Sequence, residues 1–194
     1  MNICIYGASS ADLTQSYYDA AEELGRALSL RGHGLVFGGG RNGLMGACAR
    51  GVSAGGGDIL GVAPRFFDEP GVLYEKCTDF IFTDTMRQRK QLMEERSDAV
   101  VVLPGGIGTY EEFFEMLTLR QLGQSGKAIA ILNTNGYYAP MAALLRHTVE
   151  QKFMSARCLS LFAVVDTPAQ ALDYLESYIP ETVGSVRRLQ DYTK

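Results

Sequence analysis

The chain has 194 residues, a length that suits one domain with a substantial buried core. Hydrophobic residues make up 46% of the chain and charged residues 21%, as is typical of globular proteins, and the net charge of −4 argues against a general nucleic-acid binder or a basic membrane-surface protein. No apolar run approaches the roughly 18 residues of a membrane helix. A strand is predicted from residue 2 onward, so we expect a cytoplasmic protein without a secretory leader.

Short apolar runs alternate with helical patterns along the chain. The apolar runs predict strands at residues 2–6, 35–37, 58–64, 79–83, 99–103, 128–132 and 161–165. The helical patterns predict helices at residues 11–32, 44–56, 86–96, 109–122 and 137–153, and a last helix from Pro168. Residues 65–78 carry neither pattern and predict an irregular loop.

The predicted strands are apolar throughout instead of alternating with polar residues, which is typical of a parallel sheet buried on both faces. The sequence therefore predicts an α/β fold: a single-domain, Rossmann-like, doubly wound parallel sheet flanked by helices. We expect this domain at residues 1–179 and a polar C-terminal tail at residues 180–194. Ligands bind such folds at the carboxyl ends of the strands. The glycine-rich segments at residues 7–10, 38–43 and 105–108 are expected to meet there.

The segment GGGRNG matches the G-x-G-x-x-G pattern at Gly38, Gly40 and Gly43, between a predicted strand and a predicted helix. Two features argue against a dinucleotide site. The segment follows the second strand instead of the first, and Asp58 precedes the next strand, whereas a ribose would need an acid at the end of that strand. A tight turn without a ligand is one alternative. We favour a site for a mononucleotide or a phosphorylated small molecule.

The segment PGGIGT, residues 104–109, is a stronger indication of a phosphate site. Gly105, Gly106 and Gly108 allow backbone N–H groups to face a ligand without an obstructing Cβ. The helix that follows adds free N–H groups and the positive end of its dipole. No Lys-Ser/Thr pair follows the glycines, so the segment is not a Walker A loop and suits a monophosphate.

Glu112 has two interpretations because it lies three residues after Thr109. The two residues match a T-x-x-E capping box, in which Glu112 bonds back to the N–H of Thr109 and begins the helix. Alternatively, Glu112 is a catalytic carboxylate in the first helical turn, kept ionised by the helix dipole. It would then act as a nucleophile, a base or a stabiliser of positive charge. We expect the neighbouring Glu111 to be solvated.

Arg89 lies near the middle of the apolar face predicted for the helix at residues 86–96, with Arg96 close by on the same face. A guanidinium is rarely buried without a partner. Arg89 either forms a structural ion pair or extends its stem along apolar surface, or it is directed at a phosphate or a charge that develops in a reaction. Lys90, at the edge of this face, is expected to be solvated or to face a ligand.

The cysteines and histidines indicate neither a disulfide framework nor a metal site. Cys4, Cys48, Cys77 and Cys158 are widely spaced and form no CxxC pair, which predicts reduced and mostly buried thiols. The two histidines are far apart, so no His/Cys cluster predicts a zinc site.

The segments GGGRNGLMG, MRQRK and PGGIGTYEE together resemble the Lonely Guy (LOG) family of cytokinin riboside 5′-monophosphate phosphoribohydrolases, many of which were once labelled possible lysine decarboxylases. The family pattern PGGxGTxxE runs here from Pro104 to Glu112, and the preceding M-x-x-R-K helix pattern runs from Met86 to Lys90. The segments GVAP and LNTNGYY also follow the family pattern. The resemblance covers most of residues 1–175 and is specific because these segments occur together.

This resemblance implies an enzyme that hydrolyses the N-glycosidic bond of N6-substituted adenosine 5′-monophosphates, often also of AMP, to the free base and ribose 5-phosphate. It implies a homodimer that needs no metal and no redox cofactor. It also implies that Arg89 and Glu112 are the catalytic pair. The implied phosphate loop is Gly105, Gly106, Ile107, Gly108 and Thr109, and the implied residues around the nucleotide are Gly39, Gly40, Met86, Arg87 and Lys90.

A non-catalytic protein that binds a nucleotide or a phosphorylated cofactor is the alternative, as in related Rossmann-like carrier proteins. Such a protein shares the glycine turns but does not need Arg89 and Glu112 in one site. A dinucleotide-linked enzyme is a third hypothesis. Lysine decarboxylation fits poorly, because it normally uses pyridoxal phosphate and Lys90 lacks the recognisable surroundings of a Schiff-base lysine. Preference for a prenylated base over plain adenine stays open.

Overall fold

The structure, a computed structural model, describes residues 1–180. Residues 181–194, nearly all of the predicted polar tail, lie outside the described residues. Within residues 1–180, none of the helices is both long and apolar enough to cross a membrane.

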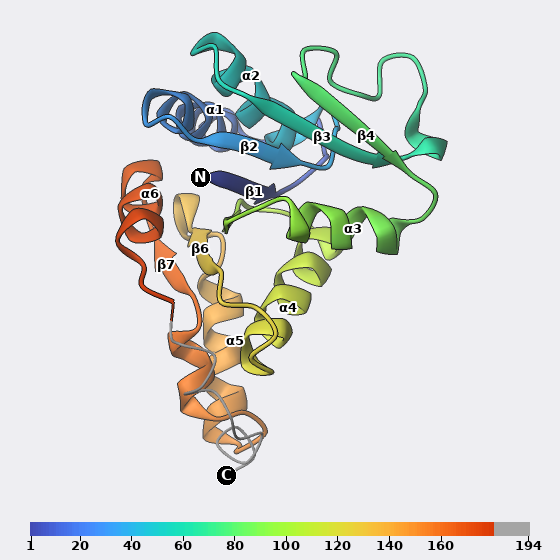
Figure 1. The fold of residues 1–194 in the computed structure, drawn as a ribbon. Helices are drawn as coiled ribbons and strands as arrows, with labels where there is room; N and C mark the ends of the chain where they lie inside the picture. The colour runs from blue at the N-terminus through green and yellow to red at the C-terminus, as the bar shows by residue number, and fades with distance from the viewer. Residues whose placement is uncertain (181–194) are drawn as a thin grey trace.

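Seven parallel strands form one sheet in the described part of the chain (Figure 1). Their order is β4-β3-β2-β1-β5-β6-β7, so the chain builds outward from β1 to β4 and then returns to place β5 on the other side of β1. The predicted doubly wound parallel sheet is confirmed. The strands are β1 (Asn2–Tyr6), β2 (Gly34–Phe37), β3 (Ile59–Pro64), β4 (Asp79–Thr83), β5 (Ala99–Val102), β6 (Ala128–Leu132) and β7 (Ala163–Val165).

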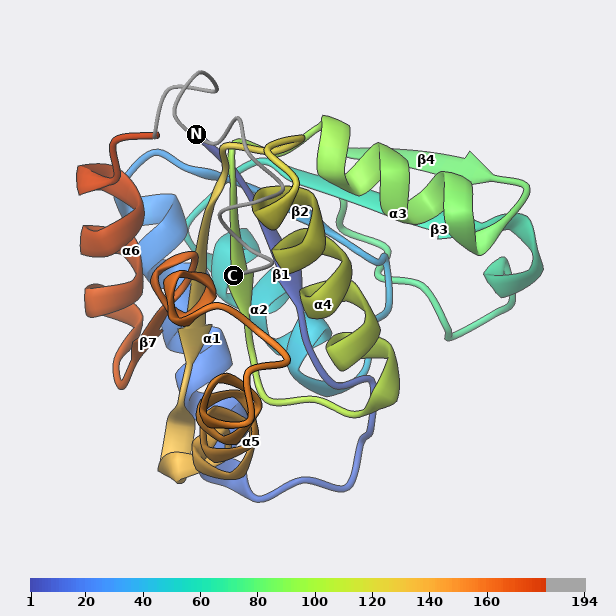
Figure 2. The same cartoon turned by 90° about the horizontal axis from the view of Figure 1, so that it is seen from below.

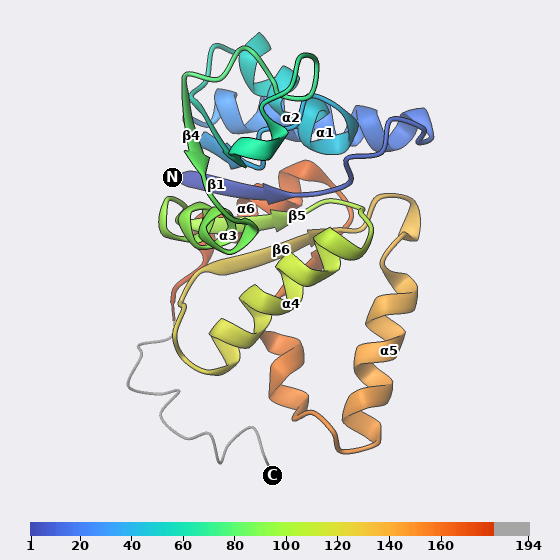
Figure 3. The same cartoon turned by 90° about the vertical axis from the view of Figure 1, so that its right-hand side faces the viewer.

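Helices connect the strands and cover both faces of the sheet. Figure 3 shows α1 and α2 above the sheet and α4 and α5 below it, and Figure 2 shows α6 on the side of α1. The helices are α1 (Gln15–Leu30), α2 (Gly43–Ala54), α3 (Met86–Glu95), α4 (Ile107–Gln121), α5 (Ala139–Glu150) and α6 (Pro168–Ser177). Short 3-10 turns lie at Arg65–Phe67, Thr134–Gly136 and Ala156–Ser160.

Alternate side chains of the strands enter two separate cores. Ile3 and Ile5 of β1 pack with residues of α1, α2 and α6, whereas Cys4 and Tyr6 pack with residues of α3, α4 and α5. All four side chains are buried. Because helices cover both faces, a central strand needs apolar residues at every position, which explains the uninterrupted apolar runs in the sequence.

The boundaries of several elements differ from the predicted ones. α1 begins at Gln15, four residues after its predicted start, and β7 spans only the last three residues of its predicted range. α3, by contrast, begins at Met86 as predicted, directly after Thr85, whose hydroxyl accepts a hydrogen bond from the Gln88 N–H in a complete capping box. α4 begins at Ile107, two residues earlier than predicted.

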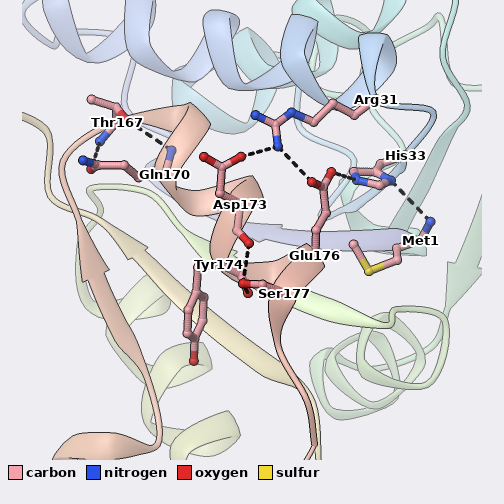
Figure 4. Close-up of polar contacts among 9 residues, drawn as sticks. All are labelled: Met1, Arg31, His33, Thr167, Gln170, Asp173, Tyr174, Glu176 and Ser177. Atoms are coloured by element: carbon pink, nitrogen blue, oxygen red, sulfur yellow. Dashed lines mark hydrogen bonds and ion pairs between the residues drawn. The ribbon is translucent and has the colours of Figure 1, made fainter.

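The last helix, α6, is tied by ion pairs to the end of the sheet where β2 begins (Figure 4). Arg31, just beyond α1, contacts Asp173 at 2.6 Å and Glu176 at 3.0 Å. His33, just ahead of β2, contacts Glu176 at 2.8 Å and lies 3.4 Å from the amine of Met1. The hydrogen bond from His33 and the charge of Arg31 lower the pKa of the Glu176 carboxyl. These contacts fasten α6 at the amino ends of the strands and leave the carboxyl ends open.

Candidate active site

A cavity of about 430 Å³ lies at the carboxyl ends of β1, β2 and β5. It lies where the strand order reverses between β1 and β5, which is where doubly wound folds bind ligands. The three glycine-rich segments meet there, as predicted. From these segments the cavity is lined by Gly7, Ala8, Ser9, Gly38, Gly40, Asn42, Gly106, Ile107, Gly108 and Thr109.

Arg89 of α3 and Glu112 of α4 face each other in the wall of this cavity. The Nη1 atom of Arg89 donates a hydrogen bond of 2.9 Å to Oε1 of Glu112. Only 6% of Arg89 and 7% of Glu112 is exposed. The pair is therefore an almost fully buried ion pair in the wall of a cavity, and its charges are screened far less than charges at the surface.

The position of Glu112 excludes the capping-box interpretation. α4 begins at Ile107 with Gly106 as its N-cap, so Thr109 is the third residue of the helix instead of its cap. Glu112 therefore lies in the second turn, where the dipole effect predicted for the first turn has largely decayed. Its carboxylate accepts a hydrogen bond from Arg89. The helix begins early because Gly106 adopts an extended conformation, which lets the next residue start the first turn.

The guanidinium of Arg89 depends on a space left by Gly38. A Cβ atom on Gly38 would lie 2.0 Å from Nη2 of Arg89, so the guanidinium would have to move from its present position. The Nε atom of Arg89 donates a hydrogen bond of 3.3 Å to the carbonyl of Val62 in β3. Arg89 is thus oriented from two sides, by a backbone carbonyl and by Glu112, and is not extended along apolar surface.

The ionisation of Glu112 reflects two opposing effects. Burial raises the pKa of its carboxyl, and the charge and hydrogen bond of Arg89 offset only part of this effect, so the pKa lies above its ordinary value. Such a carboxylate is more basic than an exposed one, which suits it to accept a proton from a water molecule. Arg89 balances its charge and fixes its direction.

The amino end of α4 provides free backbone donors to the cavity. The first N–H groups of a helix have no carbonyl in a preceding turn, and here they belong to residues that line the cavity. A Cβ on Gly106 or Gly108 would meet nothing within 4 Å, because both glycines border open space. Gly105 serves a different purpose. It is buried, and its Cβ would lie 2.1 Å from the hydroxyl oxygen of Thr109.

The other predicted residues divide between the cavity and its surroundings. Gly40 and Met86 line the cavity, whereas Gly39, Gly105, Arg87 and Lys90 are not among its lining residues. Gly39, with a φ of +75°, packs against Phe80. Arg87 is exposed on the outer side of α3.

Lys90 connects the two helices that carry the ion pair. Its ammonium lies 2.8 Å from Glu111 and 3.2 Å from Glu115, both on α4. The hydrogen bond to Glu111 raises the pKa of Lys90. Glu111 is exposed, as predicted, but is paired with Lys90.

Arg96 was predicted on the face of Arg89. It is exposed because α3 ends at Glu95 and the backbone of Arg96 leaves the helical conformation.

One wall of the cavity comes from residues 65–78, which the sequence pattern predicted only as an irregular loop. Phe67, Val72 and Leu73 line the cavity from this loop, and Met45 of α2 adds to the same lining. The loop returns to the sheet through an isolated bridge between Gly40 and Leu73. The available signal was its position, since it leaves the carboxyl end of β3.

The described cysteines are free, and Cys4, Cys48 and Cys158 are buried, in agreement with the prediction of reduced and mostly buried thiols. Burial raises the pKa of the Cys4 and Cys48 thiols to about 12. Among residues 1–180, no group of three or more His, Cys, Asp or Glu side chains is placed to hold a metal ion.

Residues 45–175 match the family model described as possible lysine decarboxylase. The chain is 37% identical over 188 residues to "Probable cytokinin riboside 5′-monophosphate phosphoribohydrolase LOGL6" of Oryza sativa subsp. japonica, covering 97% of this chain and 75% of that one. It is 35% identical over 179 residues to "Cytokinin riboside 5′-monophosphate phosphoribohydrolase LOG2" of Arabidopsis thaliana, covering 92% of this chain and 84% of that one.

Solved structures share the fold at lower identity. The molybdenum cofactor carrier protein of Chlamydomonas reinhardtii superposes with a TM-score of 0.70 at 22% identity, covering 90% of this chain and 95% of that one. The molybdenum cofactor binding protein of the phototrophic bacterium Rippkaea orientalis gives a TM-score of 0.65 at 18% identity, covering 91% and 94%. At these identities the likeness establishes the architecture alone.

Proposed function

The chain belongs to the Lonely Guy family, and on that premise we propose that it is a phosphoribohydrolase that cleaves the N-glycosidic bond of adenosine 5′-monophosphates. The observation that carries the proposal is the buried pair of Arg89 and Glu112 in the wall of the cavity. The preferred substrate class is N6-substituted adenosine monophosphates, as the names of the relatives suggest.

The 5′-phosphate would lie at the amino end of α4. There, backbone N–H groups of residues 106–109 and the positive end of the helix dipole favour an anion. The charge of Arg89 offsets the repulsion that the phosphate would otherwise meet from Glu112. Binding at this unreactive end of the substrate would orient the ribose for attack.

The reaction needs a group that stabilises positive charge on the ribose. The bond between C1′ and the base nitrogen breaks, and its electron pair goes to the base. Glu112 would stabilise the oxocarbenium character that develops on the ribose. A water oxygen bonds to C1′, Glu112 accepts the proton that this water loses, and the departing base takes a proton from solvent. Arg89 would hold the carboxylate in the direction that this step requires.

The base would lie against the apolar wall. Met45, Phe67, Val72, Leu73 and Met86 offer side chains that can contact a flat purine and an apolar substituent on it. This wall supports an N6-substituted adenine over a smaller or charged base.

Two other functions are less well supported. Decarboxylation of lysine would need a Schiff-base lysine of low pKa, but Lys90 is held by Glu111 and Glu115 with a raised pKa and is not among the lining residues. A non-catalytic carrier is the second candidate, favoured by the fold that the chain shares with molybdenum cofactor carrier proteins. A carrier has no evident need for a buried carboxylate beside its ligand.

A product assay separates the enzyme from the carrier. The protein is incubated with AMP and with isopentenyladenosine monophosphate, and the products are separated by chromatography. We expect free base and ribose 5-phosphate. Tight binding by calorimetry without release of base from either nucleotide would favour the carrier and exclude the hydrolase.

We also propose, on the family resemblance, that the protein is a cytoplasmic homodimer that needs no metal or redox cofactor, with residues 1–179 as one domain. Light scattering after gel filtration tests the dimer, and limited proteolysis tests the domain. Full base release in the presence of a chelator and in the absence of added cofactor would support the last expectation.

A further inference from the structure

We propose that Tyr137 positions the phosphate loop by holding the carbonyl group of Gly105, which directs the N–H group of Gly106 into the cavity. This inference rests on the proposed function, because it assigns the loop to the 5′-phosphate of the substrate. Tyr137 is not among the residues that line the cavity, so it acts through the loop and not on the substrate itself.

Three successive carbonyl groups at the entry to the loop each accept a hydrogen bond. The pairs are the Tyr138 hydroxyl to the Leu103 carbonyl at 2.7 Å, the Ala8 N–H to the Pro104 carbonyl at 3.0 Å, and the Tyr137 hydroxyl to the Gly105 carbonyl at 2.7 Å. All three acceptor residues are buried. The backbone is therefore held from the residue after β5 to the residue before the N-cap of α4.

The hydrogen bond from Tyr137 to the Gly105 carbonyl also determines the direction of the Gly106 N–H group. In a planar trans peptide, the C=O and N–H groups point to opposite sides. The carbonyl of Gly105 and the N–H of Gly106 belong to the same unit. Tyr137 does not line the cavity and holds the oxygen from outside it, so we infer that the N–H points the opposite way, toward the cavity that Gly106 lines. The hydroxyl thus aligns the first donor that an arriving phosphate would meet.

The position of Tyr137 follows from the turn before α5. Asn135 and Gly136 adopt left-handed conformations, with φ of 55° and 72°, which reverse the chain after β6. The ring of Tyr137 packs edge-on against Tyr17 of α1, with ring centres 6.1 Å apart. The hydroxyl of Tyr110 lies 3.4 Å from that of Tyr137. This contact and burial raise the pKa of Tyr137 to about 12, so the hydroxyl stays protonated and can donate.

The test is the variant Tyr137→Phe, which removes one oxygen atom and keeps the ring. The buried carbonyl of Gly105 loses its partner, and the loop amide is no longer aligned. We expect KM for AMP and the dissociation constant for inorganic phosphate to rise together by about threefold to tenfold. We expect kcat to stay within about twofold, and the inhibition constant of adenosine, which has no phosphate, to stay unchanged.

Tyr178→Phe is the matched control. It also deletes one tyrosine hydroxyl, the one that accepts a hydrogen bond from Arg120 near the other end of α4. A purely structural loss lowers Tm in either variant but leaves phosphate affinity unchanged. A folded Tyr137→Phe protein with unchanged phosphate affinity overturns the positioning role.

A measurement on the unaltered protein keeps the inference testable if Tyr137→Phe does not fold. In ¹⁵N-labelled protein, the amide proton of Gly106 should move downfield when inorganic phosphate is added, and an unmoved Gly106 signal at saturating phosphate overturns the inference. Both phosphate measurements are independent of turnover. Absence of base release from AMP would therefore contradict the proposed function without deciding the role of Tyr137.

Discussion

Replacing Glu112 with glutamine tests whether the buried carboxylate takes part in the reaction. Glutamine has nearly the same shape and keeps an oxygen that can accept the 2.9 Å hydrogen bond from Arg89. A hydrogen bond to a charged group contributes about 1.5–3 kcal/mol, and a neutral one about 0.5–1.5 kcal/mol. The hydrogen bond from Arg89 therefore becomes weaker, but the substitution also removes a buried charge whose desolvation cost exceeds its pairing with Arg89, as the raised pKa of Glu112 indicates. We therefore expect Tm at neutral pH to stay the same or to rise, and a large fall in Tm would contradict this reasoning.

The effect on turnover should be far larger than the effect on stability. Removing a group that accepts a proton and stabilises charge lowers kcat by about 10²–10⁴-fold. The assay is chromatographic release of base from AMP, with nucleotide binding measured separately by calorimetry. Glu111→Gln is the matched control, because it makes the same substitution at the exposed neighbour and should change kcat by less than about threefold. A folded Glu112→Gln protein with kcat within tenfold of the original would refute a catalytic carboxylate.

Three further predictions concern pH, steric space and the docking of α6. Burial raises the pKa of Glu112 above its ordinary value of 4.5, and the reaction needs the ionised carboxylate. We therefore expect kcat/KM to fall as the pH is lowered, with the midpoint of this fall above pH 4.5. A midpoint at or below pH 4.5 would contradict this. Gly38→Ala should displace Arg89 and lower the rate of base release by at least about tenfold. It should also lower the free energy of unfolding by about 1–3 kcal/mol, measured by chemical denaturation. Unchanged activity would show that the close approach of Arg89 to Gly38 is unnecessary. Glu176→Gln should lower Tm at neutral pH because it removes the ion pair with Arg31 and weakens the hydrogen bond with His33. Since the pKa of Glu176 is lowered in the folded state, this Tm difference should vanish in acid below that pKa, and a constant difference would exclude the ion pair as its cause.

The fold could be predicted because its physical signal is strong and local. Seven uninterrupted apolar runs alternate with helical patterns, and this arrangement is typical of a parallel sheet that helices cover on both faces. The meeting of the glycine-rich segments followed from topology alone, since each one comes after the carboxyl end of a strand.

The start of α4 shows where sequence pattern was insufficient. Thr109 and Glu112 have the spacing of a capping box, yet Gly106 caps the helix and the threonine packs over Gly105 instead. A spacing rule cannot tell which of several residues in a glycine-rich turn becomes the cap, because glycine can adopt either conformation. The sequence also did not predict that Phe67 and Leu73 line the cavity. A loop without periodicity gives no information about the direction in which it folds.

Among the described residues, all those that line the cavity come from the first part of the chain, so substitutions in the two parts of the chain have different effects on it. The residues that line the cavity run from Gly7 to Glu112, so the later part of the described chain, from β6 to α6, supports the cavity without bordering it. Substitutions of the lining residues change the surface that a ligand contacts directly. Within residues 113–180, substitutions affect the cavity indirectly, through the residues that line it, and the hydrogen bond of Tyr137 to Gly105 is one such connection. The outer surface of the described chain from β6 to α6 can therefore change without replacing any residue that lines the cavity.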